Sequence, residues 1–231
     1  MRRFFVSDID AHQQVIQLPQ EESKHISKVL RMQLGDKIEI VNGKGDLFEA
    51  EIILNHQKHC QVRITSQKHF NKDAFHIHIA IAPTKNMDRF EYFLEKSTEL
   101  GIHEITPIIC ANSERKIIKN ERLEKVLIAA MKQSKRLYLP KLNPLTTIEE
   151  FIKQHPSGLV AHCYNNQKNE LSKALASSNL PVLIGPEGDF SVDEIQELIK
   201  NNYLPITLGK TRLRTETAGL YACALLKNYL E

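Results

Sequence analysis

The sequence lacks any long apolar run. No stretch approaches the roughly 18 consecutive apolar residues that a membrane-spanning helix requires. Near the start, Arg2 and Arg3 precede a short apolar segment, but Asp8 and Asp10 interrupt it before it reaches the length of a signal peptide's apolar core. The chain is therefore expected to act in the cytoplasm, without a membrane partner.

Cysteine pairs at metal-binding or redox spacing are also missing. The four cysteines lie far apart, at Cys60, Cys110, Cys163 and Cys223. Without close pairs or an export signal, they are interpreted as reduced and mostly buried thiols. His76 and His78 share one face of an expected strand, but no third ligand follows at a matching spacing. We interpret them as packed or exposed histidines, and no metal is expected.

The chain has little net charge and no complete nucleotide-binding motif. Its formal charge is +3, so binding of a polyanion would need local clusters of basic residues. Gly209-Lys210-Thr211 resembles the end of a phosphate-binding loop, but Leu204 stands where the first glycine is required. Gly43-x-Gly45 has Phe48 in place of the third glycine of a dinucleotide motif. There is no internal repeat and no low-complexity segment.

The first seventy residues predict a small β-barrel-like domain. Short runs of alternating apolar residues lie between Ile38 and Ile64, and Asn42–Asp46 supplies a glycine-containing hairpin turn. One helix is expected over Glu21–Met32, ending before Gly35. The polar segment Gln67–Asp73 is interpreted as a linker. We therefore expect one domain over residues 1–70 and a second over residues 74–231.

The second part alternates between strand and helix patterns. The expected strands are Phe75–Ile81, Ile105–Ile109, Gly158–Cys163, Pro181–Gly185 and Leu204–Gly209. Helices occupy the intervals, including Asp88–Leu100, Glu121–Lys135, two that open with the capping boxes Thr147-x-x-Glu150 and Ser191-x-x-Glu194, and a last one from about Thr217. The apolar stripe of the last helix includes Tyr221 and Tyr229. This alternation predicts an α/β domain with a mostly parallel sheet.

Two loops after expected strands carry the candidate site, because ligands of open parallel sheets bind where strands end. The first is Gly185–Ser191, where glycines allow a ligand to approach the backbone closely and Pro186 stiffens the loop. The second is Lys210–Thr217, which holds two arginines, a carboxylate and several hydroxyl groups. Each loop alone could be an ordinary turn between a strand and a helix. Together they could form one pocket.

Basic residues gather in three places that suit RNA. The predicted RNA-binding residues are Arg2, Arg3, Lys28, Arg31, Lys135 and Arg136. Aromatic residues beside cations, such as Phe4 and Phe5 after Arg3, combine phosphate contacts with base stacking. Each cluster could instead be a solvated face, and basic residues at the end of a helix also complement its dipole.

An ordered set of motifs resembles the bacterial 16S ribosomal RNA uridine-N3 methyltransferases of the SPOUT superfamily. The set is spread over nearly the whole chain: Arg3-Phe4-Phe5, His25, Val29–Met32, Gly35-Asp36, Lys96–Gly101, Gln133–Arg136 before Pro140, Ile184–Gly188, Leu208-Gly209 and Leu213–Ala218. The resemblance implies an N-terminal PUA-like RNA-binding barrel, a C-terminal SPOUT domain with a trefoil knot, and a homodimer. Its implied substrate is 16S rRNA, in the small ribosomal subunit.

The same resemblance implies S-adenosylmethionine as the cofactor, bound by the loops of the knot. The matching positions are Ile184, Gly185, Pro186, Glu187, Gly188, Leu208, Gly209, Leu213, Arg214, Thr215, Glu216 and Ala218. One position departs from the family pattern, because Asp189 stands where a second glycine is usual. Aspartate tolerates a positive φ better than most residues, so the assignment stands while the fine geometry of the cofactor site is left open.

Arg214 and Glu216 are the candidate catalytic residues. We expect Arg214 to stabilise negative charge on the carbonyl oxygens of the uracil, and Glu216 to orient groups or relay a proton. The two could instead form a structural ion pair that holds the last loop. Two other functions remain open at this point, a non-catalytic rRNA-binding assembly factor and an α/β enzyme with another nucleotide cofactor.

Overall fold

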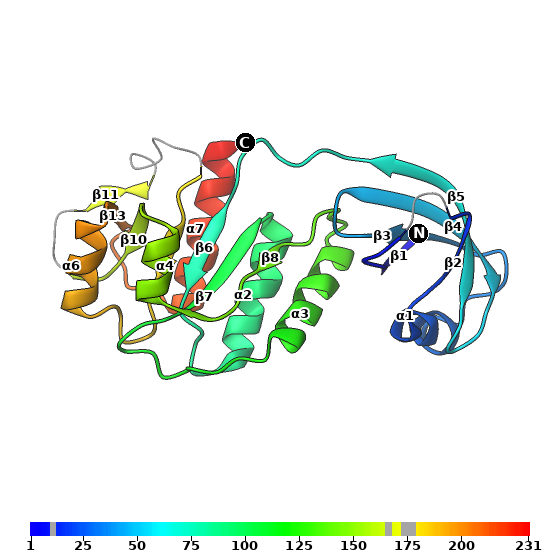
Figure 1. Cartoon of the computed structure of the whole chain (residues 1–231), viewed down its shortest axis with the longest axis horizontal. Coiled ribbons are helices and arrows are strands. Elements are labelled where there is room, and N and C mark those ends of the chain that lie inside the picture. The colour runs from blue at the N-terminus through cyan, green and yellow to red at the C-terminus, as the bar shows by residue number, and fades with distance from the viewer. Residues whose placement is uncertain (10–12, 165–167, 172–178) are drawn as a thin grey trace. The chain divides into compact units, whose positions relative to one another are not determined.

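The computed structural model describes residues 1–9, 13–164, 168–171 and 179–231. The chain forms two compact units (Figure 1). Unit 1 comprises Met1–Asp73 and Met131–Leu139, and unit 2 comprises Ala74–Ala130 and Pro140–Glu231. The predicted domain bounds of 1–70 and 74–231 stay a prediction. No helix within the described residues is long and apolar enough to cross a membrane.

Unit 1 is built on a five-stranded sheet in the order β1-β3-β4-β5-β2. Its strands are β1 (Arg2–Phe5), β2 (Val15–Gln17), β3 (Lys37–Val41), β4 (Asp46–Leu54) and β5 (Gln61–His69). Among the described strands of this sheet, β1 and β3 pair in parallel and the other pairs are antiparallel. Alternate residues point into an apolar core that includes Phe4, Ile38 and Phe48.

The hairpin turn between β3 and β4 has the predicted chemistry. Gly43 and Gly45 have φ values of 73° and 99°, a conformation that favours glycine. The Asn42 side-chain oxygen accepts hydrogen bonds from the backbone N–H groups of Lys44 and Asp46, at 2.9 and 3.3 Å. The predicted hairpin is therefore confirmed.

Two predictions for unit 1 were wrong in extent. The helix expected over Glu21–Met32 consists of a short α1 (Gln20–Lys24) and a π-helical turn, η1 (His25–Val29), and Arg31 leaves the helical region with φ 52°. The expected linker begins too early, because Gln67–His69 belongs to β5 and pairs with Asp46–Phe48. That end of β5 is exposed, so its polar side chains resemble those of a loop.

Unit 2 contains a sheet in the order β11-β13-β10-β12-β6-β7-β8, with β9 paired to β7. All of these pairings are parallel, as the sequence predicts. The strands are β6 (His78–Ile81), β7 (Glu104–Ile109), β8 (Lys141–Leu142), β9 (Thr146–Thr147), β10 (Gly158–Ala161), β11 (Asn169–Glu170), β12 (Val182–Ile184) and β13 (Tyr203–Thr207). Since β10 lies between β12 and β13, their carboxyl ends meet at one edge.

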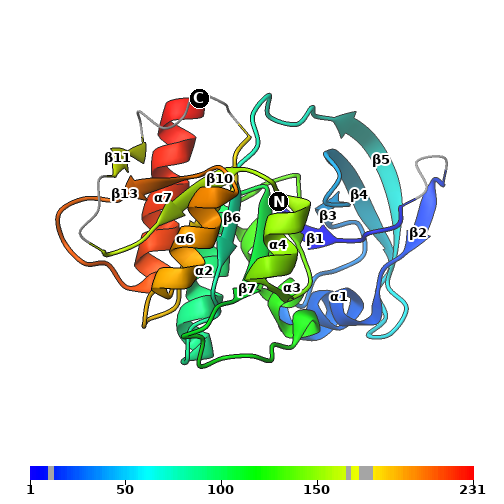
Figure 2. The same ribbon diagram turned by 60° about the vertical axis from the view of Figure 1, so that its left-hand side comes forward.

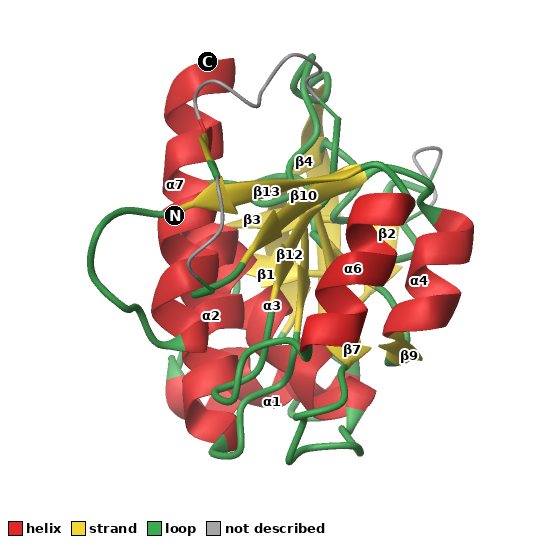
Figure 3. Cartoon of the chain, turned by 90° about the vertical axis from the view of Figure 1, so that its left-hand side faces the viewer, coloured by secondary structure: helices red, strands yellow, loops and turns green. Residues whose placement is uncertain are grey.

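Helices cover both faces of this sheet, as Figures 2 and 3 show. α2 (Met87–Leu100) and α7 (Thr215–Leu230) pack together on one face, while α4 (Ile148–Gln154) and α6 (Val192–Lys200) cover the other. α3 (Asn120–Gln133) completes the described helices. The backbone of α7 packs closely at Gly219, where an added Cβ would lie 2.7 Å from the Phe93 ring.

The helix ends follow the sequence signals. Both predicted capping boxes are present, with Thr147 and Glu150 opening α4 and Ser191 and Glu194 opening α6. The predicted stripe of α7 is wrong in part, since Tyr221 and Tyr229 are 44% and 51% exposed. The helix expected between residues 163 and 181 lies largely outside the described residues.

Candidate active site

Three loops meet at the carboxyl ends of β10, β12 and β13. The loop after β13 is wide and leads into the first turn of α7 (Figures 2 and 3). The loop after β12 leads into α6. Ligands of open parallel sheets bind at such edges.

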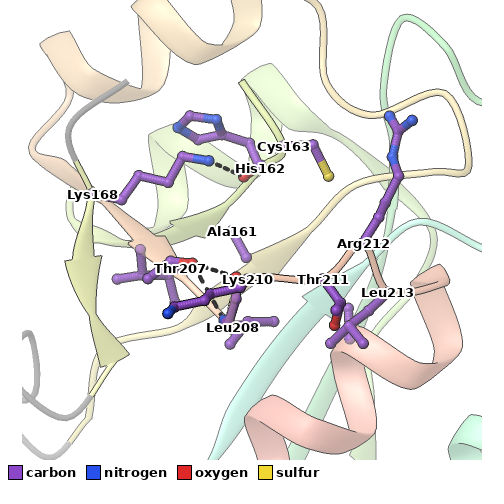
Figure 4. A pocket seen from close by; sticks show the side chains of 13 residues that line it. Ala161, His162, Cys163, Lys168, Thr207, Leu208, Lys210, Thr211, Arg212 and Leu213 are labelled. Atoms are coloured by element: carbon purple, nitrogen blue, oxygen red, sulfur yellow. Dashed lines mark hydrogen bonds between the residues drawn. The ribbon is translucent and has the colours of Figure 1, made fainter. Parts of the chain in front are cut away.

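The first cavity, of about 480 Å³, lies between the ends of β10 and β13 (Figure 4). Its lining residues are Ala161, His162, Cys163, Lys168, residues 206–213 and Ala218. The Lys168 ammonium donates a hydrogen bond of 2.6 Å to the His162 carbonyl oxygen. Gly209 has φ 118°, and an added Cβ would meet no atom within 4 Å. The glycine therefore lets the backbone turn while leaving space beside it.

A second cavity, of about 330 Å³, lies along the loop after β12. Its lining residues are Ala161, Cys163, Ile184–Glu187, Asp189, Arg212–Thr215 and Ala218. The two cavities share Cys163, Leu213 and Ala218 among their lining residues, so they adjoin. Together they offer apolar walls, exposed backbone and charges of both signs.

Asp189 links two of the loops. Its Oδ2 accepts a hydrogen bond of 2.7 Å from the backbone N–H of Cys163, and its Oδ1 accepts one of 2.9 Å from Phe190. Its φ is 63°, so this position does adopt the positive φ that the sequence suggested. Nearby, Asn112 donates to the carbonyl oxygens of Gly188 and Asp189, both at 3.1 Å.

Most of the predicted cofactor-binding residues line the two cavities. Those that do are Ile184, Gly185, Pro186, Glu187, Leu208, Gly209, Leu213, Arg214, Thr215 and Ala218. Gly188 and Glu216 do not line them. The Thr215 hydroxyl donates a hydrogen bond of 3.1 Å to the Gly185 carbonyl oxygen, which ties the start of α7 to the loop after β12.

The two candidate catalytic residues lie in different environments. Arg214 is exposed at the cavity wall, immediately before α7. Glu216 is buried, with 7% of its surface exposed, and its Oε1 lies 3.9 Å from Nε of Arg89 on α2. Among the described residues, the ion-pair partner of Glu216 is therefore Arg89 rather than Arg214.

Sequence reasoning did not select the residues that follow β10. His162, Cys163 and Lys168 line the first cavity only because β10 lies between β12 and β13. Burial lowers the pKa of His162. The chain order of the strands gives no sign of this central position, although a rule that every strand end is a candidate would have included these residues. Cys163 is exposed, whereas the other three cysteines are buried.

The predicted RNA-binding residues all belong to unit 1. Arg2, Lys28, Arg31 and Lys135 are exposed. Arg3 instead donates to Glu39 at 2.8 Å and to the Arg136 carbonyl oxygen at 3.3 Å, with only 9% of its side chain exposed. Arg136 is half-buried, 4.0 Å from Asp73.

The described residues contain no cluster of three or more His, Cys, Asp or Glu side chains arranged to hold a metal ion. The two candidate histidines have protein partners. His76 hydrogen-bonds to Glu104 at 2.9 Å, and buried His78 hydrogen-bonds to the Thr106 hydroxyl at 2.7 Å.

Fold and site define the class of protein. The RNA methyltransferase domain family matches residues 71–227, and the RNA methyltransferase PUA domain family matches residues 18–65. This protein is an RNA methyltransferase with an N-terminal PUA domain and a C-terminal α/β domain, as the resemblance implied. The trefoil knot stays a prediction.

Within that class, the chain belongs to the ribosomal RNA small subunit methyltransferase E family. Its relative from Rickettsia conorii is 30% identical over 97% of this chain and 94% of its own length. A probable rRNA methyltransferase from Porphyromonas gingivalis has a similar structure, with 36% identity and a TM-score of 0.89 over 99% of this chain and 98% of its own. The Neisseria gonorrhoeae ribosomal RNA small subunit methyltransferase E, solved bound to S-adenosyl methionine, is 25% identical with a TM-score of 0.89, over 99% of this chain and 97% of its own.

Proposed function

We propose that this protein transfers the methyl group of S-adenosylmethionine to N3 of a uridine in 16S rRNA of the small ribosomal subunit. The pair of adjoining cavities at the ends of β10, β12 and β13 carries the proposal. The class and the family restrict the reaction to methylation of small-subunit rRNA. The uridine and its N3 position come from the sequence resemblance.

The cavity walls fit S-adenosylmethionine, which combines an aromatic base with an amino acid and a positive sulfonium. Ile184, Leu208 and Leu213 offer apolar surface for the base. Glu187 and Asp189 suit the positive groups, and Arg212 suits a carboxylate. Gly209 leaves backbone beside open space, so a ligand can approach it closely. When bound, the cofactor supplies an electrophilic methyl group.

The protein's own contribution is to orient and stabilise the base. Uridine N3 is a poor nucleophile until its proton is lost, and negative charge then develops on the carbonyl oxygens beside it. Arg214, exposed at the cavity wall, is placed to stabilise that charge. Glu216, buried in the first turn of α7, orients neighbouring groups.

RNA is held by unit 1 in this proposal. Arg2, Lys28, Arg31 and Lys135 are exposed cations there and contact phosphates. Arg3 and Arg136, which the sequence also predicts as RNA contacts, support this surface through their mutual contact. Homodimerisation and the trefoil knot stay predictions from the family resemblance, and action in the cytoplasm stays a prediction from the sequence.

Calorimetric titration with S-adenosylmethionine tests the cofactor site. We expect wild-type protein to bind with a micromolar Kd. Ala218→Trp, which places a large side chain at the wall that both cavities share, should raise the Kd more than about tenfold, a change of about 1.4 kcal/mol. Tyr221→Trp is the matched control, because Tyr221 is exposed on the same helix outside the cavities. Equal binding by wild-type protein and Ala218→Trp would contradict the site.

The reaction is tested on small ribosomal subunits from a bacterium whose own enzyme has been deleted. Digested rRNA should contain 3-methyluridine, identified by mass spectrometry against the pure nucleoside, only when protein and cofactor are both added. A folded protein that binds the subunits but neither binds the cofactor nor methylates the RNA would instead be an assembly factor.

A further inference from the structure

A third cavity, of about 410 Å³, lies beside the proposed cofactor site. It is lined by Lys85, Asn86, Arg89, Glu114 and Glu187. These residues come from the segment between β6 and α2, from the first turn of α2, and from the loops after β7 and β12. Glu187 also lines the second cavity, so the third cavity adjoins the cofactor site at this side chain. A molecule in it would lie next to the bound cofactor.

Most of the charged groups around this third cavity already have partners. The Lys85 ammonium pairs with Glu114 at 2.8 Å, and the Lys85 backbone N–H donates to Glu187 at 3.0 Å. Arg115 donates to the Lys85 carbonyl oxygen at 2.7 Å. These contacts hold the cavity wall in place. The polar atoms that take part in them are already paired and are less available to a ligand.

Arg89 is different. Its side chain is 41% exposed, and its nearest carboxylate oxygen, Oε1 of Glu216, lies 3.9 Å from its Nε, beyond hydrogen-bonding distance. Among the described residues no hydrogen bond from its guanidinium group is present. A guanidinium carries five N–H donors, so this cavity presents a cation whose donors are available to a ligand.

Glu216 gives an independent indication of a site. It is 7% exposed, and its Oε2 has no hydrogen-bond partner among the described residues. A buried carboxylate oxygen without a donor is unfavourable, and such groups need a structural or functional reason. The negative charge of Glu216 lies behind Arg89 and limits the positions that the guanidinium can adopt.

We propose that the third cavity receives the uracil base to be methylated, and that Arg89 donates hydrogen bonds to the C4 carbonyl oxygen of that base. This inference rests on the proposed function. Uracil presents only acceptors at both carbonyl positions beside N3, whereas cytosine presents an amino donor at one of them, which would face the donors of Arg89. Arg89 therefore selects uracil and stabilises the negative charge that develops on it. Glu216 is the positioning residue for Arg89.

Arg89 takes part in no bond change. The bond between N3 and the methyl carbon forms as the bond between sulfur and that carbon breaks, and the N3 proton passes to water. The positive charge of the sulfonium leaves with that proton. The contribution of Arg89 is a preorganised donor for charge on the base.

The test compares Arg89→Ala with wild type on unmodified small subunits. We expect kcat to fall by about 100-fold, the loss typical when a donor to a developing negative charge is removed. The Kd for S-adenosylmethionine should change by less than about twofold, because Arg89 lines neither cofactor cavity. Arg122→Ala is the matched control, since Arg122 of α3 is an exposed arginine that pairs with Glu91, a residue on the same helix as Arg89.

The outcomes separate this inference from the proposed function. If the wild-type protein methylates the subunits and Arg89→Ala does so with the same kcat, the role of Arg89 is overturned and the proposed function stands. Equal losses of turnover and cofactor affinity in Arg89→Ala would also overturn it. No methyl transfer by wild-type protein that binds the subunits would remove the proposed function, and this inference with it.

A double-mutant cycle tests the role of Glu216. Glu216→Gln keeps the size of the side chain but removes the charge that positions Arg89, so kcat should fall while cofactor affinity is kept. In Arg89→Ala the same change should have little further effect, because Glu216 acts through Arg89. Losses that multiply in the double variant would show that Glu216 acts independently of Arg89 and would overturn its positioning role.

Discussion

At the scale of single residues, the backbone of Asp189 is strained, whereas its side chain makes stabilising hydrogen bonds. A left-handed φ costs a non-glycine residue about 1 kcal/mol. In return, the carboxylate accepts hydrogen bonds from Cys163 and Phe190 and joins the loops after β10 and β12. A glycine at this position would avoid the strain but could not make the link. The aspartate therefore accepts backbone strain that a glycine would avoid, and its carboxylate joins two loops of the proposed cofactor site by a hydrogen bond.

Substitutions of Asp189 should separate these two effects. Asp189→Ala keeps the strain and loses the link, so we expect its free energy of unfolding to fall by about 2 kcal/mol, within the range for a hydrogen bond to a charged group. Asp189→Gly loses the link but also relieves the strain, so its loss should be smaller by about 1 kcal/mol. Urea denaturation gives both values. Equal losses in the two variants would show that the left-handed φ stores no strain.

At the scale of elements, β6, β7 and α4 meet around a buried histidine. His78 on β6 hydrogen-bonds to Thr106 on β7, and its ring lies 5.1 Å from that of His155, just beyond α4. Burial lowers the pKa of His78 to about 4. Hydrogen bonds from His76 and Asn143 hold the pKa of the neighbouring Glu104 well below its usual range. The neutral form of His78 is thus part of this packing.

This packing predicts a loss of stability in acid. Below pH 6.5 the unfolded chain protonates His78 while the folded chain does not, so the free energy of unfolding falls as the pH drops towards 4. The contribution of His78 is about 3 kcal/mol at most, at about 1.4 kcal/mol per unit of pH. Burial lowers the pKa of His155 too, which adds a loss of the same sign. The stabilisation from Glu104 is lost only below the usual pKa of a carboxyl group.

Urea denaturation between pH 4 and pH 7 measures this effect. His78→Gln should show a shallower dependence on pH than wild type, whatever its stability at neutral pH. His59→Gln, at an exposed position in unit 1, should keep the wild-type slope. The same slope in all three proteins would exclude His78 as the titrating group.

At the scale of the whole molecule, the two units carry different parts of the proposed function. Unit 1 holds the exposed cations predicted to contact RNA, and unit 2 holds all three cavities. Phosphate contacts depend on salt concentration, whereas contacts inside the cavities depend on shape and hydrogen bonding. Substitutions in the two units should therefore have separable effects on binding and on turnover.

Salt dependence of RNA affinity tests the role of unit 1. The double variant Lys28→Ala and Arg31→Ala should lower the slope of log K against log salt by about 1.4 to 1.8, since each phosphate contact contributes about 0.7 to 0.9. Arg3→Ala should leave the slope nearly unchanged and lower stability instead, because Arg3 is ion-paired with Glu39. If Arg3→Ala lowered the slope of log K against log salt and the double variant did not, Arg3 rather than Lys28 and Arg31 would contact the RNA phosphates.

The sequence by itself determined the features that depend on near neighbours. The capping boxes at Thr147 and Ser191 could be predicted because the interacting groups lie three residues apart. The hairpin at Asn42–Asp46 and the loop Gly185–Ser191 could be predicted because glycine permits a positive φ and proline fixes φ, so each favours a turn locally. The alternation of strands and helices, and with it the α/β class, follows from the periodicity of apolar residues.

Only the tertiary structure decided which distant residues meet. The order of strands in a parallel sheet depends on how the crossovers pack, and no local pattern records it. That order places β10 between β12 and β13 and so brings Cys163 to the two adjoining cavities of the proposed cofactor site. The packing of α2 against α7 places Arg89 beside Glu216. Both contacts are long-range, and they depend on the folding of the whole sheet with its helices.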